Sequence, residues 1–171
     1  SVPEMRFLGA GLALAGNAIQ AFDAIGLKED VLKAGKILKI LNIKDQHGKV
    51  LSSTDAEAMS RKLGVVNNFA VHRADLHKVL LEHMPKDSYQ LGKEVKDFSS
   101  NDHGVLLNFS DGTQYEADYV IACDGIRSVF RRKLMSSSTP RYAGYTCWRG
   151  VIDQIPAGIN EYETSETWGN G

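Results

Sequence analysis

Cysteine is scarce in this sequence, net charge is almost absent, and long apolar runs are missing. The two cysteines, Cys123 and Cys147, lack CxxC spacing and lie among apolar residues, which predicts reduced core residues of a cytoplasmic protein rather than a disulfide. A formal net charge of -1 argues against a nucleic-acid partner. Because nothing resembles a signal peptide and no apolar run could span a bilayer, we expect no membrane association.

Motifs for metal or nucleophilic chemistry are also missing. The five histidines show no metal-ligand spacing, and no Ser-His-Asp arrangement can be argued from the sequence. The sequence therefore predicts no metal site and no catalytic acid, base or nucleophile.

What the sequence does contain is an ordinary globular composition, with 43% hydrophobic and 24% charged residues. That composition is enough for a real core, and the spacing of apolar and turn residues predicts both helices and strands. The run at 119–123 is continuously apolar, which is typical of a buried parallel strand. Helices are expected at 17–25 (capped by Asn17 and Gly26), 28–33, 74–84 and 129–134, and strands at 37–44, 49–52, 63–67, 89–98, 105–109, 114–117, 119–123 and 142–152.

A short glycine segment, Gly9-Ala10-Gly11, raises the question of a dinucleotide-binding turn. That fingerprint needs a buried strand leading into Gly-x-Gly-x-x-Gly at the start of a helix. Here the preceding residues, "SVPEMRFL", make a poor buried strand, and Leu14 stands where the third glycine belongs. We therefore do not interpret the segment as a pyrophosphate loop. An NAD(P)-binding dehydrogenase domain that uses these glycines remains the less favoured alternative.

Four segments resemble the FAD-dependent group A aromatic hydroxylases, the monooxygenase family with the p-hydroxybenzoate hydroxylase fold. They are "RFLGAGLALAGNAIQAFDAIGL", "HRADLHKVLL", "ADYVIACDGIRSVFRRKL" and "YAGYTCWRGVI", and they occur in the family's order. The resemblance implies an α/β fold (α+β overall), in which part of a Rossmann-like FAD-binding domain, 1–35 and 68–138, is interleaved with part of a substrate-binding sheet domain, 36–67 and 139–171.

The resemblance also implies that the family's pyrophosphate fingerprint and its later Gly-Asp motif fall outside this sequence. We therefore expect an internal fragment of such an enzyme that, by itself, binds FAD weakly or not at all and does not hydroxylate. Tight, stoichiometric FAD binding would contradict this expectation.

The resemblance assigns seven residues to the cofactor and none to catalysis. Arg73 would contact the flavin, since a guanidinium offers several directed hydrogen bonds. Val95 could equally be a core residue, and Asp124 could simply cap a helix. The predicted cofactor-binding residues are Gly9, Ala10, Gly11, Arg73, Val95, Asp124 and Gly125.

Two further pairs are weaker candidates. Arg127 and Arg131 are four apart, so on a helix they would share one face, where they could attract nicotinamide phosphates or form a solvated basic surface. Trp148 and Arg149 would lie on opposite faces of a strand, so at most one would face a substrate.

The activity implied by the resemblance is flavin-dependent hydroxylation. NAD(P)H would reduce FAD, and the reduced flavin would capture O2 as a C4a-hydroperoxide that hydroxylates a small aromatic substrate. An inactive remnant or interaction module of this fold is the other hypothesis. Unpaired strand edges would then make self-association possible.

Overall fold

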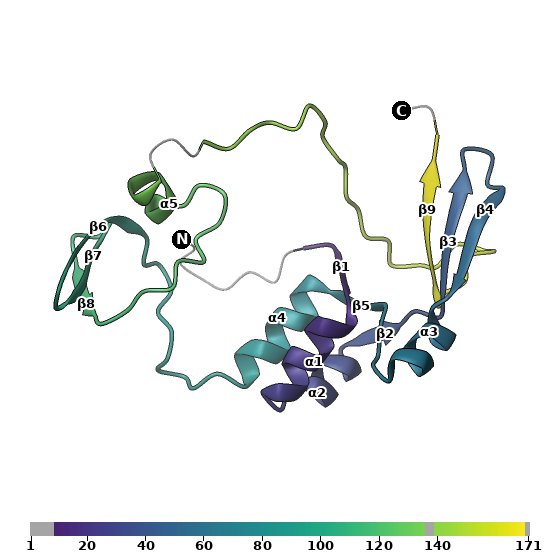
Figure 1. Cartoon of the computed structure of the whole chain (residues 1–171), viewed down its shortest axis with the longest axis horizontal. Helices are drawn as coiled ribbons and strands as arrows, with labels where there is room; N and C mark the ends of the chain where they lie inside the picture. Colours follow the sequence, from purple (N-terminus) through teal and green to yellow (C-terminus); the bar gives the residue numbers. More distant parts are fainter. Residues whose placement is uncertain (1–8, 136–138, 170–171) are drawn as a thin grey trace. The chain divides into compact units, whose positions relative to one another are not determined.

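The computed structural model describes residues 9–135 and 139–169. They fall into two compact units, one made of 85–135 and 139–148 and the other of 9–84 and 149–169. Figure 1 shows the elements of both. The boundaries of these units differ from those of the predicted FAD and substrate domains. The units are defined by contacts within the chain, whereas the predicted domains are defined by the ligand that each would bind. That domain division therefore stays a prediction.

The larger unit contains a three-stranded antiparallel sheet with the order β1-β5-β2. The central strand β5 (Phe69–His72) pairs with β1 (Gly11–Leu14) and β2 (Gly35–Ile37). Three helices accompany this sheet, namely α1 (Gly16–Ala24), α2 (Lys28–Lys33) and α4 (Arg73–Glu82). The buried core between them consists of Ile19, Val31, Phe69, Val71 and Leu76.

The two N-terminal helices were predicted closely. Gly26 has a φ of 74° just after α1, a left-handed conformation in which glycine is favoured. Asn17 as N-cap was wrong, because Ala15 occupies that position and no side chain caps the helix. Gly16 instead donates its backbone N–H to Asn67 Oδ1 at 3.2 Å. A residue 51 positions away thus replaces the local cap.

The same unit holds a second three-stranded sheet, with the order β4-β3-β9. Strand β3 (Ile40–Asp45) pairs antiparallel with β4 (Val50–Asp55) and parallel with β9 (Glu163–Trp168). Helix α3 (Ala56–Leu63) follows β4 directly, and Asp55 caps it by accepting the Ala58 N–H at 2.8 Å. The predicted strand at 37–44 therefore corresponds to two strands in different sheets.

The smaller unit contains the antiparallel meander β6-β7-β8 and a short helix. The strands are β6 (Val95–Asn101), β7 (Gly104–Phe109) and β8 (Gln114–Ala117), and the helix is α5 (Val129–Leu134). Phe98, Leu107 and Phe130 form its core, in which the rings of Phe98 and Phe130 stack with centroids 4.5 Å apart. The hairpin predicted at Asp111-Gly112 is confirmed.

Several predicted features do not form. Segments 63–67, 119–123 and 142–152 contain no strand. In the apolar run at 119–123, Tyr119 and Ile121 are about nine-tenths exposed (91% and 90%), because no described strand pairs with it, and a strand needs a hydrogen-bonded neighbour. Cys123 and Cys147 are free but exposed, so the prediction that they are core residues was wrong.

Candidate functional site

The glycine segment lies against the start of α4. Arg73, the first residue of that helix, donates its backbone N–H to the Ala10 carbonyl at 3.1 Å. A Cβ added to Gly9 would lie 2.9 Å from Arg73 Cβ and 3.0 Å from Arg73 Cδ. Gly9 also has a φ of 152°, which L side chains rarely adopt. The structure thus brings together four of the seven predicted cofactor-binding residues, and it requires glycine at position 9.

One face of β1 is nearly free of side chains. Leu12 and Leu14 pack against the core, whereas Gly11 and Ala13 on the other face are exposed. A Cβ added to Gly11 would meet nothing within 4 Å. A flat surface made of backbone and a methyl group suits the close approach of a planar ring such as flavin.

The backbone of Gly11 is turned away from the sheet. Since Arg73 donates to Ala10, these two residues form a hydrogen-bonded pair, and the next pair along the antiparallel ladder, Gly11 with His72, is not hydrogen-bonded. The N–H and C=O of Gly11 therefore point away from β5, on the edge strand of the sheet. No strand among the described residues pairs with β1 on that side, so these groups can face a polar ring edge and the residues present fit a flavin.

The segment does not have the geometry of a pyrophosphate loop. Gly11 opens a strand, and α1 begins only at Gly16, whereas the fingerprint glycines lead from a strand directly into a helix. The residues before Gly9 lie outside the described range.

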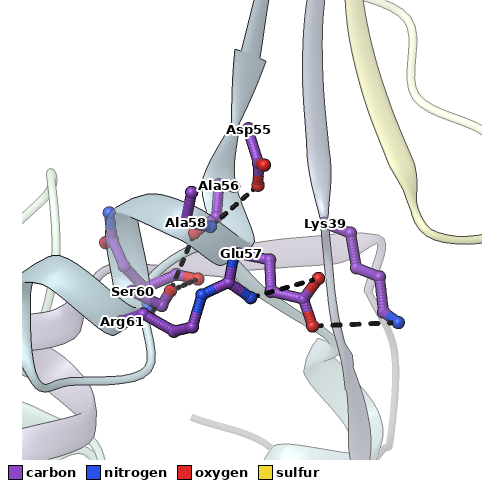
Figure 2. Close-up of polar contacts among 8 residues, drawn as sticks. Lys39, Asp55, Ala56, Glu57, Ala58, Ser60 and Arg61 are labelled. Atoms are coloured by element: carbon purple, nitrogen blue, oxygen red, sulfur yellow. Dashed lines mark hydrogen bonds and ion pairs between the residues drawn. The ribbon is translucent and has the colours of Figure 1, made fainter.

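The loop that holds the start of α1 is fixed in turn by α3. Asn67, which accepts from Gly16, donates its backbone N–H to Ser60 Oγ at 3.1 Å, and that hydroxyl donates to the Ala56 carbonyl at 2.9 Å. Figure 2 shows α3 with the Glu57 carboxylate between the side chains of Arg61 and Lys39. Glu57 Oε2 lies 3.6 Å from Arg61 Nη1, and Glu57 Oε1 lies 3.9 Å from Lys39 Nζ. These contacts connect the start of α1, through Asn67 and α3, to Lys39, the residue before β3.

Asp124 and Gly125 lie in the smaller unit, where they form the approach to α5. Asp124 Oδ2 accepts the Val129 N–H at 2.8 Å. Hydrogen bonding from Ser128, with smaller contributions from the Val129 N–H and the charge of Arg131, lowers the pKa of Asp124. Gly125 has a φ of 80°, which explains glycine there. The N-cap of α5 is Ser128, which accepts the Arg131 N–H at 3.0 Å, and Asp124 satisfies the Val129 N–H beside it. A role of Asp124 toward a cofactor stays a prediction.

Val95 belongs to the same unit as Asp124. It is half-buried and packs against the core of Phe98, Leu107 and Phe130. Its side chain is thus accounted for by packing, and its predicted backbone contact with adenine stays a prediction.

Neither of the two weaker candidate pairs has the predicted arrangement. Arg127 precedes α5, which begins at Val129, so Arg127 and Arg131 do not share a helical face. Trp148 and Arg149 lie on no strand, and Trp148 is 99% exposed. The prediction that strand alternation separates this pair was therefore wrong.

Sequence reasoning missed a polar cluster on the second sheet. Lys44 Nζ lies 2.6 Å from Glu163 Oε1, although the two residues are 119 positions apart. Hydrogen bonds from Lys44 and from the Asn42 amide lower the pKa of Glu163 below its ordinary value. Asn42 itself is only 8% exposed. No local sequence pattern predicts this cluster, because Glu163 comes from β9, a strand that the sequence analysis did not predict.

The described residues hold no helix long and apolar enough to cross a membrane. They also hold no group of three or more histidine, cysteine or acidic side chains placed to bind a metal ion.

Comparisons with known proteins agree with this geometry. Residues 9–151 match the family model described as "FAD binding domain". The chain is 33% identical over 169 residues to the aurachin C monooxygenase/isomerase of Stigmatella aurantiaca, covering 99% of this chain and 44% of that protein. It is 28% identical over 161 residues to the salicylate hydroxylase of Pseudomonas putida, covering 91% of this chain and 37% of that one.

Solved structures show the same fold. Klebsiella pneumoniae HpxO, complexed with FAD and uric acid, matches with a TM-score of 0.67 and 25% identity over 78% of this chain and 33% of that one. A salicylate hydroxylase substrate complex matches with a TM-score of 0.64 and 29% identity, covering 79% and 33%. The α/β prediction is thereby confirmed, and the chain spans about two fifths of the length of the curated relatives it matches. The chain therefore belongs to the FAD-binding-domain family of the flavin-dependent aromatic hydroxylases.

Proposed function

We propose that this chain supplies the ring-facing part of the FAD site of an NAD(P)H-dependent monooxygenase that hydroxylates a small aromatic substrate. The observation that carries the proposal is the bare, exposed face of β1 at Gly11, directly beside Arg73. The match to the FAD-binding family over residues 9–151 supports it.

Gly9, Gly11 and Arg73 each have a separate role in this proposal. Gly9 allows the Arg73 side chain to lie over the backbone, and Gly11 leaves room for the ring. Arg73, at the start of α4, is disfavoured there by the helix dipole, and an electron-rich ligand edge would offset that cost. FAD, when bound, supplies the redox chemistry, and the protein orients it and excludes water.

The remaining parts of the proposal are supported by the relatives. Several have names that state monooxygenation or hydroxylation of a small aromatic, such as 6-hydroxynicotinate 3-monooxygenase and salicylate hydroxylase. On that basis we assign NAD(P)H and O2 as co-substrates. We further assign Val95, Asp124 and Gly125 to the cofactor, and 36–67 with 139–171 to the substrate-binding sheet. The free, exposed thiols of both cysteines support a reducing compartment such as the cytoplasm.

A graft tests the proposal. Residues 9–151 would replace the matching segment of Klebsiella pneumoniae HpxO, whose structure holds FAD. We expect a folded protein that copurifies with FAD, and in which NADH or NADPH reduces the flavin. An Arg73→Met graft should fold equally, as judged by circular dichroism, but retain less flavin. A folded, colourless wild-type graft would contradict the proposal.

A further inference from the structure

The β4-β3-β9 sheet has one strongly polar face. The register places Ile40, Asn42 and Lys44 of β3 opposite Glu163, Ser165 and Thr167 of β9. On the other side of β3, Ser53 of β4 lies opposite Asn42. Residues paired across strands share a face, so hydroxyl, amide and charged side chains gather around Asn42.

An ion pair forms a roof over Asn42. Lys44 lies two residues beyond Asn42 on β3, whereas Glu163 is level with Ile40, two residues before it. The 2.6 Å contact between Lys44 and Glu163 therefore crosses the sheet diagonally at the level of Asn42. Both side chains are mostly shielded from solvent, at 26% and 18% exposure. This roof accounts for the burial of Asn42.

Beneath this ion pair, one buried hydrogen-bond acceptor, the side-chain oxygen of Asn42, has no donor among the described residues. Asn42 hydrogen-bonds Glu163, and since a carboxylate only accepts, the amide must use its NH2 group there. Asn42 Oδ1 is buried and accepts no hydrogen bond from any residue that the structure describes. A buried acceptor without a donor costs free energy, so this oxygen is suited to a ligand that brings an N–H or O–H.

The only cation on this face is already neutralised. Within β3, β4 and β9, which the structure describes in full, Lys44 is the only cation on the polar face and pairs with Glu163, while Asp55, opposite Ile40, adds a second carboxylate. An anionic ligand would have to displace Glu163 from Lys44 and leave a carboxylate without its partner, which is costly in a partly buried site. A neutral ligand avoids that cost.

We propose that this face recognises a neutral aromatic ligand through a hydrogen bond donated to Asn42 Oδ1, and that it discriminates against aromatic carboxylates. The inference rests on the proposed function, since it takes this sheet as the substrate-binding one. A ligand reaches Asn42 Oδ1 only if the Lys44 and Glu163 side chains, 26% and 18% exposed, move from above it. Phenols, carboxamides and ring N–H groups are the donors that fit.

A pair of nearly isosteric probes tests the inference, namely benzamide, which carries an N–H donor and no charge, and benzoate, which carries a charge and no donor. Their affinities for the 171-residue chain would be measured by calorimetry, with ligand-observed NMR for weak binding. We expect the amide to bind about tenfold more tightly, the difference between a satisfied and an orphaned buried acceptor. Asn42→Leu should abolish that preference. Ser52→Ala, on the opposite face of the sheet, is the matched control and should preserve it.

A second variant removes the negative charge that neutralises Lys44. Glu163→Gln keeps the shape of the roof but frees Lys44, so the preference should shift about tenfold toward the benzoate. Equal or tighter wild-type binding of the benzoate, binding of neither probe, or an amide preference that survives Asn42→Leu would each overturn the inference. Flavin retention by the HpxO graft reports on the proposed function independently. A folded but colourless graft would overturn the flavin assignment and leave ligand discrimination standing.

Discussion

Replacing Gly11 by valine separates the structural role of the glycine segment from its role toward flavin. A Cβ at this position would meet nothing within 4 Å, and the residue lies in strand β1. Glycine inside a strand costs about 0.5–1 kcal/mol relative to alanine, and valine favours strands further. We therefore expect Gly11→Val to raise the free energy of unfolding by about 0.5–1 kcal/mol, measured by urea denaturation.

Flavin binding should respond in the opposite direction. A ring that contacts the β1 backbone at about 3.5–4 Å would overlap the valine side chain, so its affinity should fall at least about tenfold, or ~1.4 kcal/mol. Saturation transfer from the chain to the isoalloxazine protons of FAD measures this loss even for weak binding. Gly150→Val is the matched control, because its Cβ also meets nothing within 4 Å. An undiminished isoalloxazine signal in Gly11→Val would refute the flavin-facing assignment.

Three other changes probe the supports of the site. Phe69→Ala removes a fully buried ring and should lower the free energy of unfolding by about 3–5 kcal/mol; a loss below 1 kcal/mol by urea denaturation would contradict the core assignment. Asp55→Ala removes the side chain that caps α3 at the Ala58 N–H and should lower the free energy of unfolding by about 1 kcal/mol. Asp55→Asn should retain most of the stability that the cap provides. The pKa of Glu163 is lowered by Lys44, so its contribution to stability is present above its ordinary pKa and lost as pH falls through the lowered value. The protection factors of the β9 amides, which correct for the intrinsic exchange rate, should then fall at acid pH in the wild type, and much less in Glu163→Gln.

Local signals explain what the sequence could predict. Helix α2 has the predicted bounds, and α1 and α4 lie within two residues of theirs. Their apolar spacing and terminal residues belong to the segments themselves. The Asp111-Gly112 hairpin is similarly a short-range feature. The family resemblance assigned both Gly9 and Arg73 to the cofactor, but only the structure shows that the two residues lie in contact.

Non-local pairing explains what the sequence could not predict. The run at 119–123 has the composition of a buried strand but no described partner, so composition alone misassigned it. Strand β9, "ETSETW", is polar enough to pass for a loop, and it becomes a strand because β3 supplies its hydrogen bonds. Since β9 was missed, the cluster of Asn42, Lys44 and Glu163 could not be foreseen.

The parallel pairing of β3 with β9 has a consequence for synthesis of the chain. Ile40 lies opposite Glu163, so β3 waits for a partner roughly 120 residues away, which ribosomes add in about 6–25 s at 5–20 residues per second. During that interval β3 is a nascent edge, with β4 on one side only, and such edges invite intermolecular pairing. The charged residue Lys44 on β3 helps protect that edge until β9 emerges, and Glu163 then closes over it.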